Sequence, residues 1–160
     1  MGGGQGALVE RYPELRGTLM DLPEVVAQAG AVLDASPHRA RIDLVPGSFF
    51  DSVPAGADAY VLKHVLHDWD DARALTLLRN IRKGMPATGR LLVVETLITP
   101  GPESLFAKFS DMEMMVVTPS GRERTPDEYA ALFGHAGLKL ERIVPTPSPM
   151  AIIEARPAGA

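Results

Sequence analysis

The sequence lacks cysteine, any long apolar run and any excess of basic charge. Without cysteine there are no disulfides, no thiol catalysis and no zinc site with cysteine ligands. No apolar stretch approaches the ~18 residues that span a bilayer, so we expect no membrane partner. The net charge of −4 argues against a nucleic-acid partner, because neutralising phosphates requires a basic face.

The chain has 160 residues, of which 46% are hydrophobic, about one domain's worth of material and enough to bury a core. It begins with glycines, not with a basic stretch followed by an apolar one, and therefore lacks the pattern of a signal peptide. We expect a cytoplasmic globular protein.

Apolar periodicity and Pro/Gly punctuation predict alternating strands and helices. The expected strands cover residues 16–21, 41–45, 57–66, 90–98, 138–144 and 150–155, the last two antiparallel. The expected helices cover residues 7–12, 23–35, 70–85, 105–117 and 125–137. This alternation predicts an α/β sheet with helices on both faces, in which ligands bind at the carboxyl ends of the strands.

The first candidate site is the glycine segment 2–6, which runs directly into a helix. Glycines allow close backbone approach to a ligand, and a helix N-terminus offers free N–H groups. The G-x-G-x-G form is common where S-adenosylmethionine binds; a flexible leader is the alternative. Asp21 ends a strand about 20 residues later, where an acid can hold ribose hydroxyls, although turn aspartates also cap helices.

The densest polar cluster covers residues 63–71 and follows an apolar strand. His67 beside Asp68 is a candidate general base, since histidine titrates near neutrality and a carboxylate can fix its tautomer. One alternative is a helix-capping patch built on Asp68 or Asp70. A metal site built from His64, His67, Asp68 and Asp71 is the other alternative. Strand spacing predicts that His64 faces away from His67, as a packed histidine.

Two carboxylates accompany this cluster. Glu95 lies inside the apolar run 91–98, and a buried carboxylate requires a partner, either His67 or backbone amides. Glu123 lies in a charged segment, 121–125, whose ordinary interpretation is a solvated loop. The methionine and phenylalanine residues between 106 and 115 predict a core stripe, which could also form an adaptable wall for a flat aromatic ligand.

Taken in order, these segments resemble the catalytic domain of S-adenosylmethionine-dependent O-methyltransferases of the caffeate and hydroxyindole type and their bacterial relatives. The most specific segment is LKHVLHDWDD, which is similar to the family's Lys-x-x-x-His-Asp-Trp-x-Asp signature. The segments GGGQGAL, RGTLMDLPEVV, VVETLI, KFSDMEMMV and GRERTPDEY follow in the family's order. The resemblance covers essentially the whole chain.

The resemblance implies a Rossmann-like class I methyltransferase and a role for each candidate residue. His67 matches the catalytic base, and Glu95 and Glu123 match the carboxylates that position it. The implied cofactor contacts come from Gly2, Gly4, Asp21, Ser48, Phe49, Lys63 and Trp69. The implied acceptor contacts come from Asp68, Met114 and Met115. The acceptor is a small, aromatic or phenolic molecule with a hydroxyl group, and no metal is needed because the sulfonium methyl is already reactive.

The sequence departs from the family pattern in three places that matter. The helix after the glycine segment is about four residues short, close to one turn, which keeps its faces in register. Ser48 stands where an aspartate is usual, which weakens one expected adenine contact. The family also has a strand before the glycines and, ahead of it, an N-terminal dimerisation domain, and residues 1–160 include neither. We therefore expect a partial cofactor-binding domain with an empty slot between the strands at 16–21 and 57–66, and a homodimer for the full-length protein.

Three other functions remain open at this point. A nucleotide-cofactor oxidoreductase shares a similar fold, but the G-x-G-x-G segment and the His-Asp-Trp cluster argue against it. A homologue that binds S-adenosylmethionine but acts as a decarboxylase or hydroxylase is a second alternative. An inactive truncated fragment that serves only as a binding or pairing module is the third.

Overall fold

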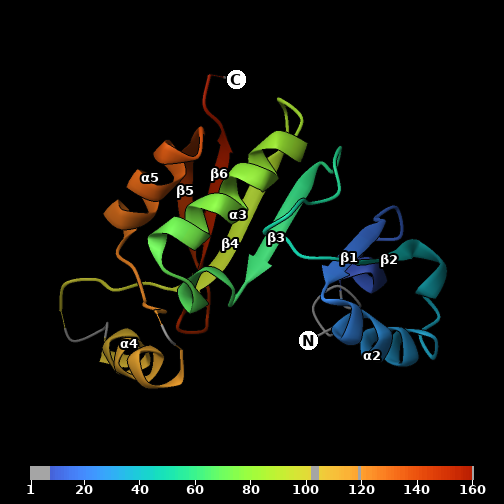
Figure 1. The fold of residues 1–160 in the computed structure, drawn as a ribbon, viewed down its shortest axis with the longest axis horizontal. Coiled ribbons are helices and arrows are strands. Elements are labelled where there is room, and N and C mark those ends of the chain that lie inside the picture. The colour runs from blue at the N-terminus through green and yellow to red at the C-terminus, as the bar shows by residue number, and fades with distance from the viewer. Residues whose placement is uncertain (1–7, 102–104, 119, 160) are drawn as a thin grey trace. The chain divides into compact units, whose positions relative to one another are not determined.

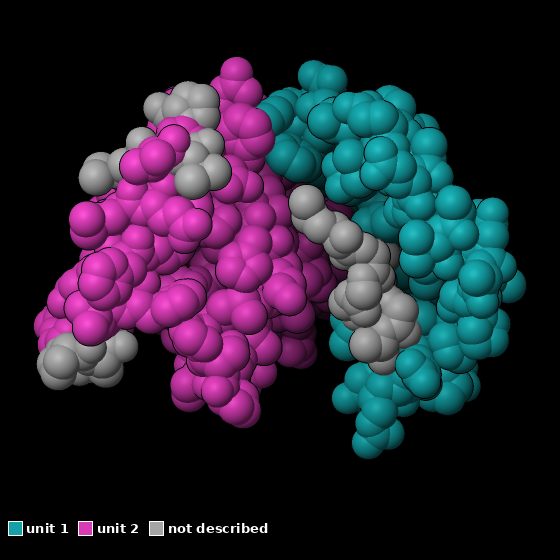
Figure 2. All heavy atoms as spheres, turned by 90° about the horizontal axis from the view of Figure 1, so that it is seen from below, with its two compact units in different colours: residues 1–54 teal, residues 55–160 magenta. Residues whose placement is uncertain are grey.

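The protein is described by a computed structural model that covers residues 8–101, 105–118 and 120–159, without the side chains of Met115 and Val117. The chain divides into two compact units, with the boundary between Pro54 and Ala55 (Figure 2). Among the described residues, no helix combines the length and apolar character that crossing a bilayer requires.

The first unit is a single strand–helix–strand repeat (Figure 1). It contains β1 (Gly17–Asp21), α2 (Pro23–Leu33), a short 3-10 helix (Arg39–Arg41) and β2 (Ile42–Pro46), preceded by a helical turn at 8–11. The strands pair in parallel, with Gly17 opposite Ile42 and Asp21 opposite Pro46. Val9, Leu33 and Ile42 form its small core, and Leu19 and Leu44 pack against them.

The second unit is a four-stranded mixed sheet in the order β3-β4-β6-β5. Its strands are β3 (Ala59–Lys63), β4 (Arg90–Thr96), β5 (Leu138–Pro145) and β6 (Met150–Pro157). Its helices are the 3-10 turn η2 (Leu66–Asp68), α3 (Asp71–Gly84), α4 (Leu105–Val117) and α5 (Pro126–His135). β3 and β4 are parallel, whereas β6 is antiparallel to both neighbours, which confirms the closing antiparallel pair.

Local sequence signals explain where the helices of the second unit begin. Asp70 caps α3 by accepting a hydrogen bond from the Arg73 backbone N–H at 2.8 Å, as one of the alternatives for the polar cluster predicted. Thr125 and Glu128 form the capping box of α5. The inward face of α3 buries Ala74, Leu77, Leu78 and Ile81, and α5 packs beside it over the sheet (Figure 1).

Two expectations about local structure are wrong. The strand predicted over 57–66 ends at Lys63, because His64 adopts a left-handed backbone with φ 52° that an extended strand does not accommodate. The methionine and phenylalanine residues of α4 do not form a core stripe, since Phe106, Phe109 and Met112 are 58–61% exposed. Periodicity identified this apolar face but could not tell whether anything covers it.

The described strands form two separate hydrogen-bonded sheets, β1-β2 and β3-β4-β6-β5. Among the residues described, β1 pairs only with β2, and β3 pairs only with β4, so each keeps one unpaired edge.

Candidate active site

His67 lies on η2, in the turn that follows β3 at the carboxyl end of the sheet. Glu95, near the end of the neighbouring strand β4, holds this turn in place. Its Oε1 accepts hydrogen bonds from the backbone N–H groups of Val65 and Leu66, each at 3.0 Å. The apolar run around Glu95 therefore buries a carboxylate that organises the turn carrying His67.

The His67 ring is surrounded by three carboxylates. Its Nδ1 lies 3.2 Å from Glu123 Oε1 and 3.5 Å from Glu95 Oε2. Its Nε2 lies 3.4 Å from Asp68 Oδ1. The side chains of Glu95 and Glu123 are at most 1% exposed, whereas Asp68 is 42% exposed. One ring nitrogen is thus enclosed, and the other lies beside a partly solvated carboxylate.

This arrangement shifts the proton equilibria at the site. The hydrogen bond to Glu123 raises the pKa of His67; burial opposes that shift, and the negative charges of Glu95, Glu123 and Asp68 reinforce it. Burial raises the pKa of Glu95, against the opposing effects of His67 and of the Val65 backbone N–H. The environment therefore makes His67 a stronger base than a free histidine.

Glu123 is positioned by α4 and by a short extended segment beside the end of β4. Arg124 of that segment forms an isolated parallel β-bridge with Leu97. The Ser110 hydroxyl donates to Glu123 Oε1 at 2.7 Å, and the Glu123 backbone N–H donates to Asp111 Oδ1 at 2.9 Å. α4 therefore orients this carboxylate toward His67.

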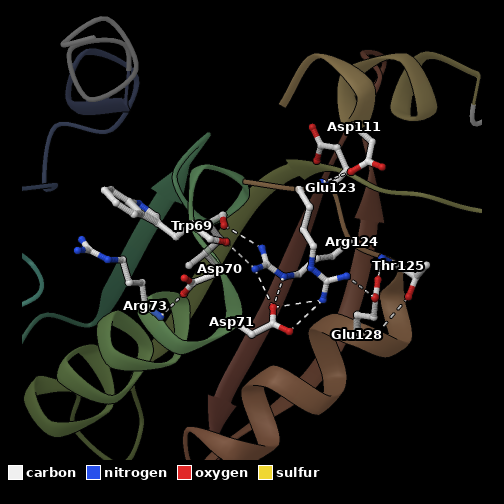
Figure 3. Close-up of polar contacts among 11 residues, drawn as sticks. Trp69, Asp70, Asp71, Arg73, Asp111, Glu123, Arg124, Thr125 and Glu128 are labelled. Carbon is white, nitrogen blue, oxygen red and sulfur yellow. Dashed lines mark hydrogen bonds and ion pairs between the residues drawn. The ribbon is translucent and has the colours of Figure 1, made fainter. Parts of the chain in front are cut away.

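Arg124 fixes the same turn from the other side (Figure 3). Its side chain is fully buried and donates to the backbone carbonyls of Leu66 and Trp69, each at 2.8 Å. It also donates to Asp71 Oδ1 from Nε at 3.0 Å and from Nη2 at 2.8 Å. The residues on both sides of His67 are thus tied to the start of α3 by one guanidinium.

Sequence reasoning missed Arg124. A solvated charged loop is the ordinary interpretation of 121–125, yet Glu123 is 2% exposed and Arg124 is 0% exposed. Composition could not show this, because the partners of Arg124 are backbone carbonyls brought near by folding. The one local signal is that the segment immediately precedes the capping box of α5.

Gly121 allows this segment to approach the turn that carries His67 closely. The Arg122 backbone N–H donates to the His67 carbonyl at 2.8 Å. A Cβ placed on Gly121 would collide with that carbonyl oxygen and with the Thr118 side chain. A side chain at this position would push the segment away from His67.

The residues expected near adenine and ribose lie in the first unit. A cavity of about 440 Å³ opens beyond the carboxyl ends of β1 and β2, and Ser48 is part of its lining, with Met20, Val45, Pro46, Gly47, Asp51, Ser52, Val53 and Pro54. Asp21 ends β1, where its Oδ1 accepts from the Leu22 backbone N–H at 2.8 Å. The Phe49 ring packs edge-on against Phe50. Gly2 and Gly4 lie outside the described residues.

The other expected binding residues lie in the second unit, around the turn that carries His67. Lys63 ends β3 with an exposed side chain, and Trp69 follows η2 with its ring 5.3 Å from the Arg73 guanidinium carbon. Met114 is half-buried on α4, and the side chain of Met115 is not described. Of all the expected site residues, the structure brings together His67, Asp68, Glu95 and Glu123.

The expected orientation of His64 is wrong. Because its left-handed backbone turns the chain, its ring lies 5.2 Å from the His67 ring, measured between centroids, and its side chain is 43% exposed. The metal ligand set considered from the sequence is not assembled either. Asp71 is bound to Arg122 and Arg124 instead.

Comparison with known proteins decides the family. The family model described as an O-methyltransferase domain matches residues 1–139. The chain belongs to the O-methyltransferase domain family. It is similar to the phenazine O-methyltransferase PhzM of Lysobacter antibioticus, with 45% identity over 151 residues, 94% of this chain and 44% of that protein. The chain therefore spans less than half the length of this curated relative.

Solved structures of this family show the same fold. The crystal structure of LaPhzM matches with a TM-score of 0.91 at 44% identity, over 96% of this chain and 46% of that one. NcsB1 from neocarzinostatin biosynthesis, in complex with S-adenosylmethionine and 2-hydroxy-5-methyl naphthoic acid, matches with a TM-score of 0.88 at 34% identity. That match covers 98% of this chain and 46% of NcsB1. The predicted class I methyltransferase fold is confirmed.

Proposed function

We propose that this chain is the S-adenosylmethionine-binding catalytic part of an O-methyltransferase that methylates a hydroxyl group of a small aromatic acceptor. His67 is the general base. The observation that carries this proposal is the pair of buried carboxylates, Glu95 and Glu123, that enclose one nitrogen of the His67 ring.

The hydrogen bond made by Nδ1 determines which nitrogen of the neutral His67 ring can accept a proton. Nδ1–H donates to Glu123 Oε1, so the neutral ring carries its proton there and keeps a lone pair on Nε2. Nε2 accepts the acceptor's hydroxyl proton as the oxygen becomes the nucleophile, and the carboxylates stabilise the resulting imidazolium. Asp68, beside Nε2, holds the acceptor hydroxyl. Bound S-adenosylmethionine supplies a methyl group already activated by its sulfonium sulfur.

The residues of the first unit fit the nucleoside part of this cofactor. Its cavity of about 440 Å³ is within the ~300–1,000 Å³ range of small-molecule sites. Asp21 at the end of β1 supplies the acidic acceptor that ribose hydroxyls require, and Ser48 gives the cavity wall a hydroxyl. The family resemblance would assign the methionine part of the cofactor to Gly2 and Gly4, the surroundings of the adenine to Phe49 and Trp69, and a further polar contact to Lys63.

The nature of the acceptor is supported by the relatives. PhzM is named a phenazine O-methyltransferase, and NcsB1 was crystallised with a hydroxylated naphthoic acid, so both are associated with aromatic molecules. We propose that Met114 and Met115 contact such a flat acceptor. We also propose that the full-length protein is a cytoplasmic homodimer. In this proposal, an N-terminal dimerisation domain accounts for the part of the relatives that the chain does not match.

Calorimetric titration of S-adenosylmethionine into the 160-residue chain tests this proposal. We expect one binding site, and Asp21→Asn should weaken binding at least ~10-fold because charge-assisted hydrogen bonds to ribose are lost. Asp43→Asn is the matched control, since this exposed aspartate lies on β2. The absence of binding by a folded chain, or equal binding by Asp21→Asn, would contradict the proposal. A chain that binds the cofactor but methylates no hydroxyl acceptor would favour a decarboxylase or hydroxylase.

A further inference from the structure

Three side chains on or beside the turn that carries His67 direct potential metal-ligand atoms toward one another. His64, His67 and Glu95 each present a ligand-type atom, and these atoms lie within 4.8 Å of one another. Glu95 Oε2 is 3.5 Å from His67 Nδ1 and 3.9 Å from His64 Nδ1. Two imidazoles and one carboxylate are a ligand set that zinc and other divalent transition metals prefer.

The two carboxylate oxygens of Glu95 differ in their hydrogen bonding. Oε1 accepts two backbone hydrogen bonds, from Val65 and Leu66. Oε2 has no hydrogen-bond partner in the protein, and the side chain is 0% exposed, so water does not reach it either. Such an oxygen is costly to bury unless a cation or a proton reaches it. It is directed toward the two histidine rings.

His64 lies on the solvent-exposed side of this group of three residues. Its positive φ is the only one at a non-glycine residue among those described, and this conformation directs the ring toward Glu95 and His67. With 43% of its side chain exposed, the ring can adjust, and water can complete a coordination shell. Burial and the nearby His67 and Lys63 lower the pKa of His64, which favours the neutral, metal-binding form.

We propose that His64, His67 and Glu95 form a binding site for a divalent transition-metal ion such as Zn²⁺, and that the ion takes Nδ1 of His67. Zinc bonds of ~2.0–2.1 Å place tetrahedral ligand atoms about 3.3 Å apart. The separations of 3.5 and 3.9 Å from Glu95 Oε2, and of at most 4.8 Å between the two histidine nitrogens, must close to this value. The exposed His64 ring can supply that movement.

Metal binding at this site has a consequence for catalysis that rests on the proposed function. An ion on Nδ1 uses that lone pair and displaces the hydrogen bond to Glu123. The neutral ring must then carry its proton on Nε2, so Nε2 can no longer accept the acceptor's hydroxyl proton. The metal is therefore an inhibitor of methyl transfer, and metal binding itself needs neither cofactor nor acceptor.

The test is calorimetric titration of the 160-residue chain with ZnCl2 in the absence of cofactor, together with ¹⁵N NMR of the histidine rings. We expect one site and a perturbed Nδ1 resonance of His67. His64→Asn should weaken zinc binding at least ~10-fold, and asparagine tolerates the left-handed backbone. His135→Asn is the matched control, because His135 is exposed at the end of α5.

The outcomes separate this inference from the proposed function. No zinc binding by the wild-type chain, equal binding by His64→Asn, or an unperturbed His67 Nδ1 would overturn the metal site, whatever the cofactor titration shows. Zinc binding in a chain that does not bind S-adenosylmethionine would leave the site intact and contradict only the methyltransferase proposal. In an active preparation, zinc should inhibit wild type at least ~10-fold more strongly than His64→Asn, and equal inhibition would overturn the proposed mode of inhibition.

Discussion

The buried guanidinium of Arg124 donates two hydrogen bonds to Asp71 Oδ1, at 3.0 Å from Nε and 2.8 Å from Nη2. This pair ties the segment that carries Glu123 to the start of α3. Although partial burial raises the pKa of Asp71, the contacts with Arg124 and Arg122 lower it overall. Because Arg124 also binds the carbonyls of Leu66 and Trp69, the pair holds the turn on which His67 lies.

Replacing Arg124 should therefore destabilise the fold. Arg124→Met leaves the Leu66 and Trp69 carbonyls without their donor, and leaving a buried acceptor unpaired typically costs ~1–3 kcal/mol. Urea unfolding followed by circular dichroism measures this cost. The control is Arg79→Met, on the exposed side of α3, which should change the free energy of unfolding by less than ~0.5 kcal/mol. Similar midpoints for the two variants would show that Arg124 does not hold the turn.

The pH dependence of methyl transfer should follow His67. The base must be neutral, so turnover should rise with pH and level off above the His67 pKa, which is raised above 6.5. Glu123→Gln removes the negative charge that stabilises the imidazolium, so the midpoint should move to lower pH and the plateau should fall. The pH–rate profiles of wild type and Glu123→Gln measure both effects. An unchanged midpoint would show that Glu123 does not affect the pKa of His67.

Gly121→Ala should disturb the catalytic turn by steric conflict alone. The added Cβ meets the His67 carbonyl oxygen and the Thr118 side chain, and overpacking of this kind costs ~1–3 kcal/mol. Gly134→Ala in α5 is the control, since its Cβ would meet nothing within 4 Å and alanine favours the helix. Thermal unfolding should rank the two variants in opposite directions from wild type. A Gly121→Ala variant as stable as wild type would contradict the observed close approach.

Thr125→Ala should weaken α5 without changing the chemistry of the site. The Thr125 side chain accepts from the Glu128 backbone N–H, and Glu128 accepts from the Thr125 backbone N–H at 2.8 Å. Loss of this capping residue costs ~0.5–2 kcal/mol. Chemical denaturation should show that loss, while the affinity for S-adenosylmethionine stays within twofold of wild type. A parallel fall in cofactor affinity would place α5 in the binding site.

Much of the fold and the centre of the site could be predicted because each depends on local signals. Strand and helix patterns predicted most of the elements, and the combination of Glu95 in an apolar run with a His-Asp-Trp cluster pointed to His67 and Glu95 as candidate site residues. Glu123 could be placed only by resemblance, because its partner His67 is distant in sequence. Such long-range pairs leave no periodic trace in a single chain.

The sequence could not predict what depends on backbone conformation or on covering surfaces. The left-handed turn at His64 reverses the direction of one ring, and strand spacing then points to the wrong face. Arg124 binds carbonyls, which every residue carries, so no pattern of residue types identifies its partners. Phe106 and Phe109 show an apolar face that is exposed in this chain, and periodicity records the face but not its environment.

The most direct test of His67 as the general base compares His67→Asn with wild type in two assays on the same preparations. One is calorimetric binding of S-adenosylmethionine, and the other is transfer of its labelled methyl group to a panel of small hydroxylated aromatic acceptors. Wild type should transfer the label, and His67→Asn should keep cofactor affinity within a few-fold while its turnover falls by ~10²–10⁴-fold. Turnover of His67→Asn within a few-fold of wild type would contradict the assignment of His67 as the base.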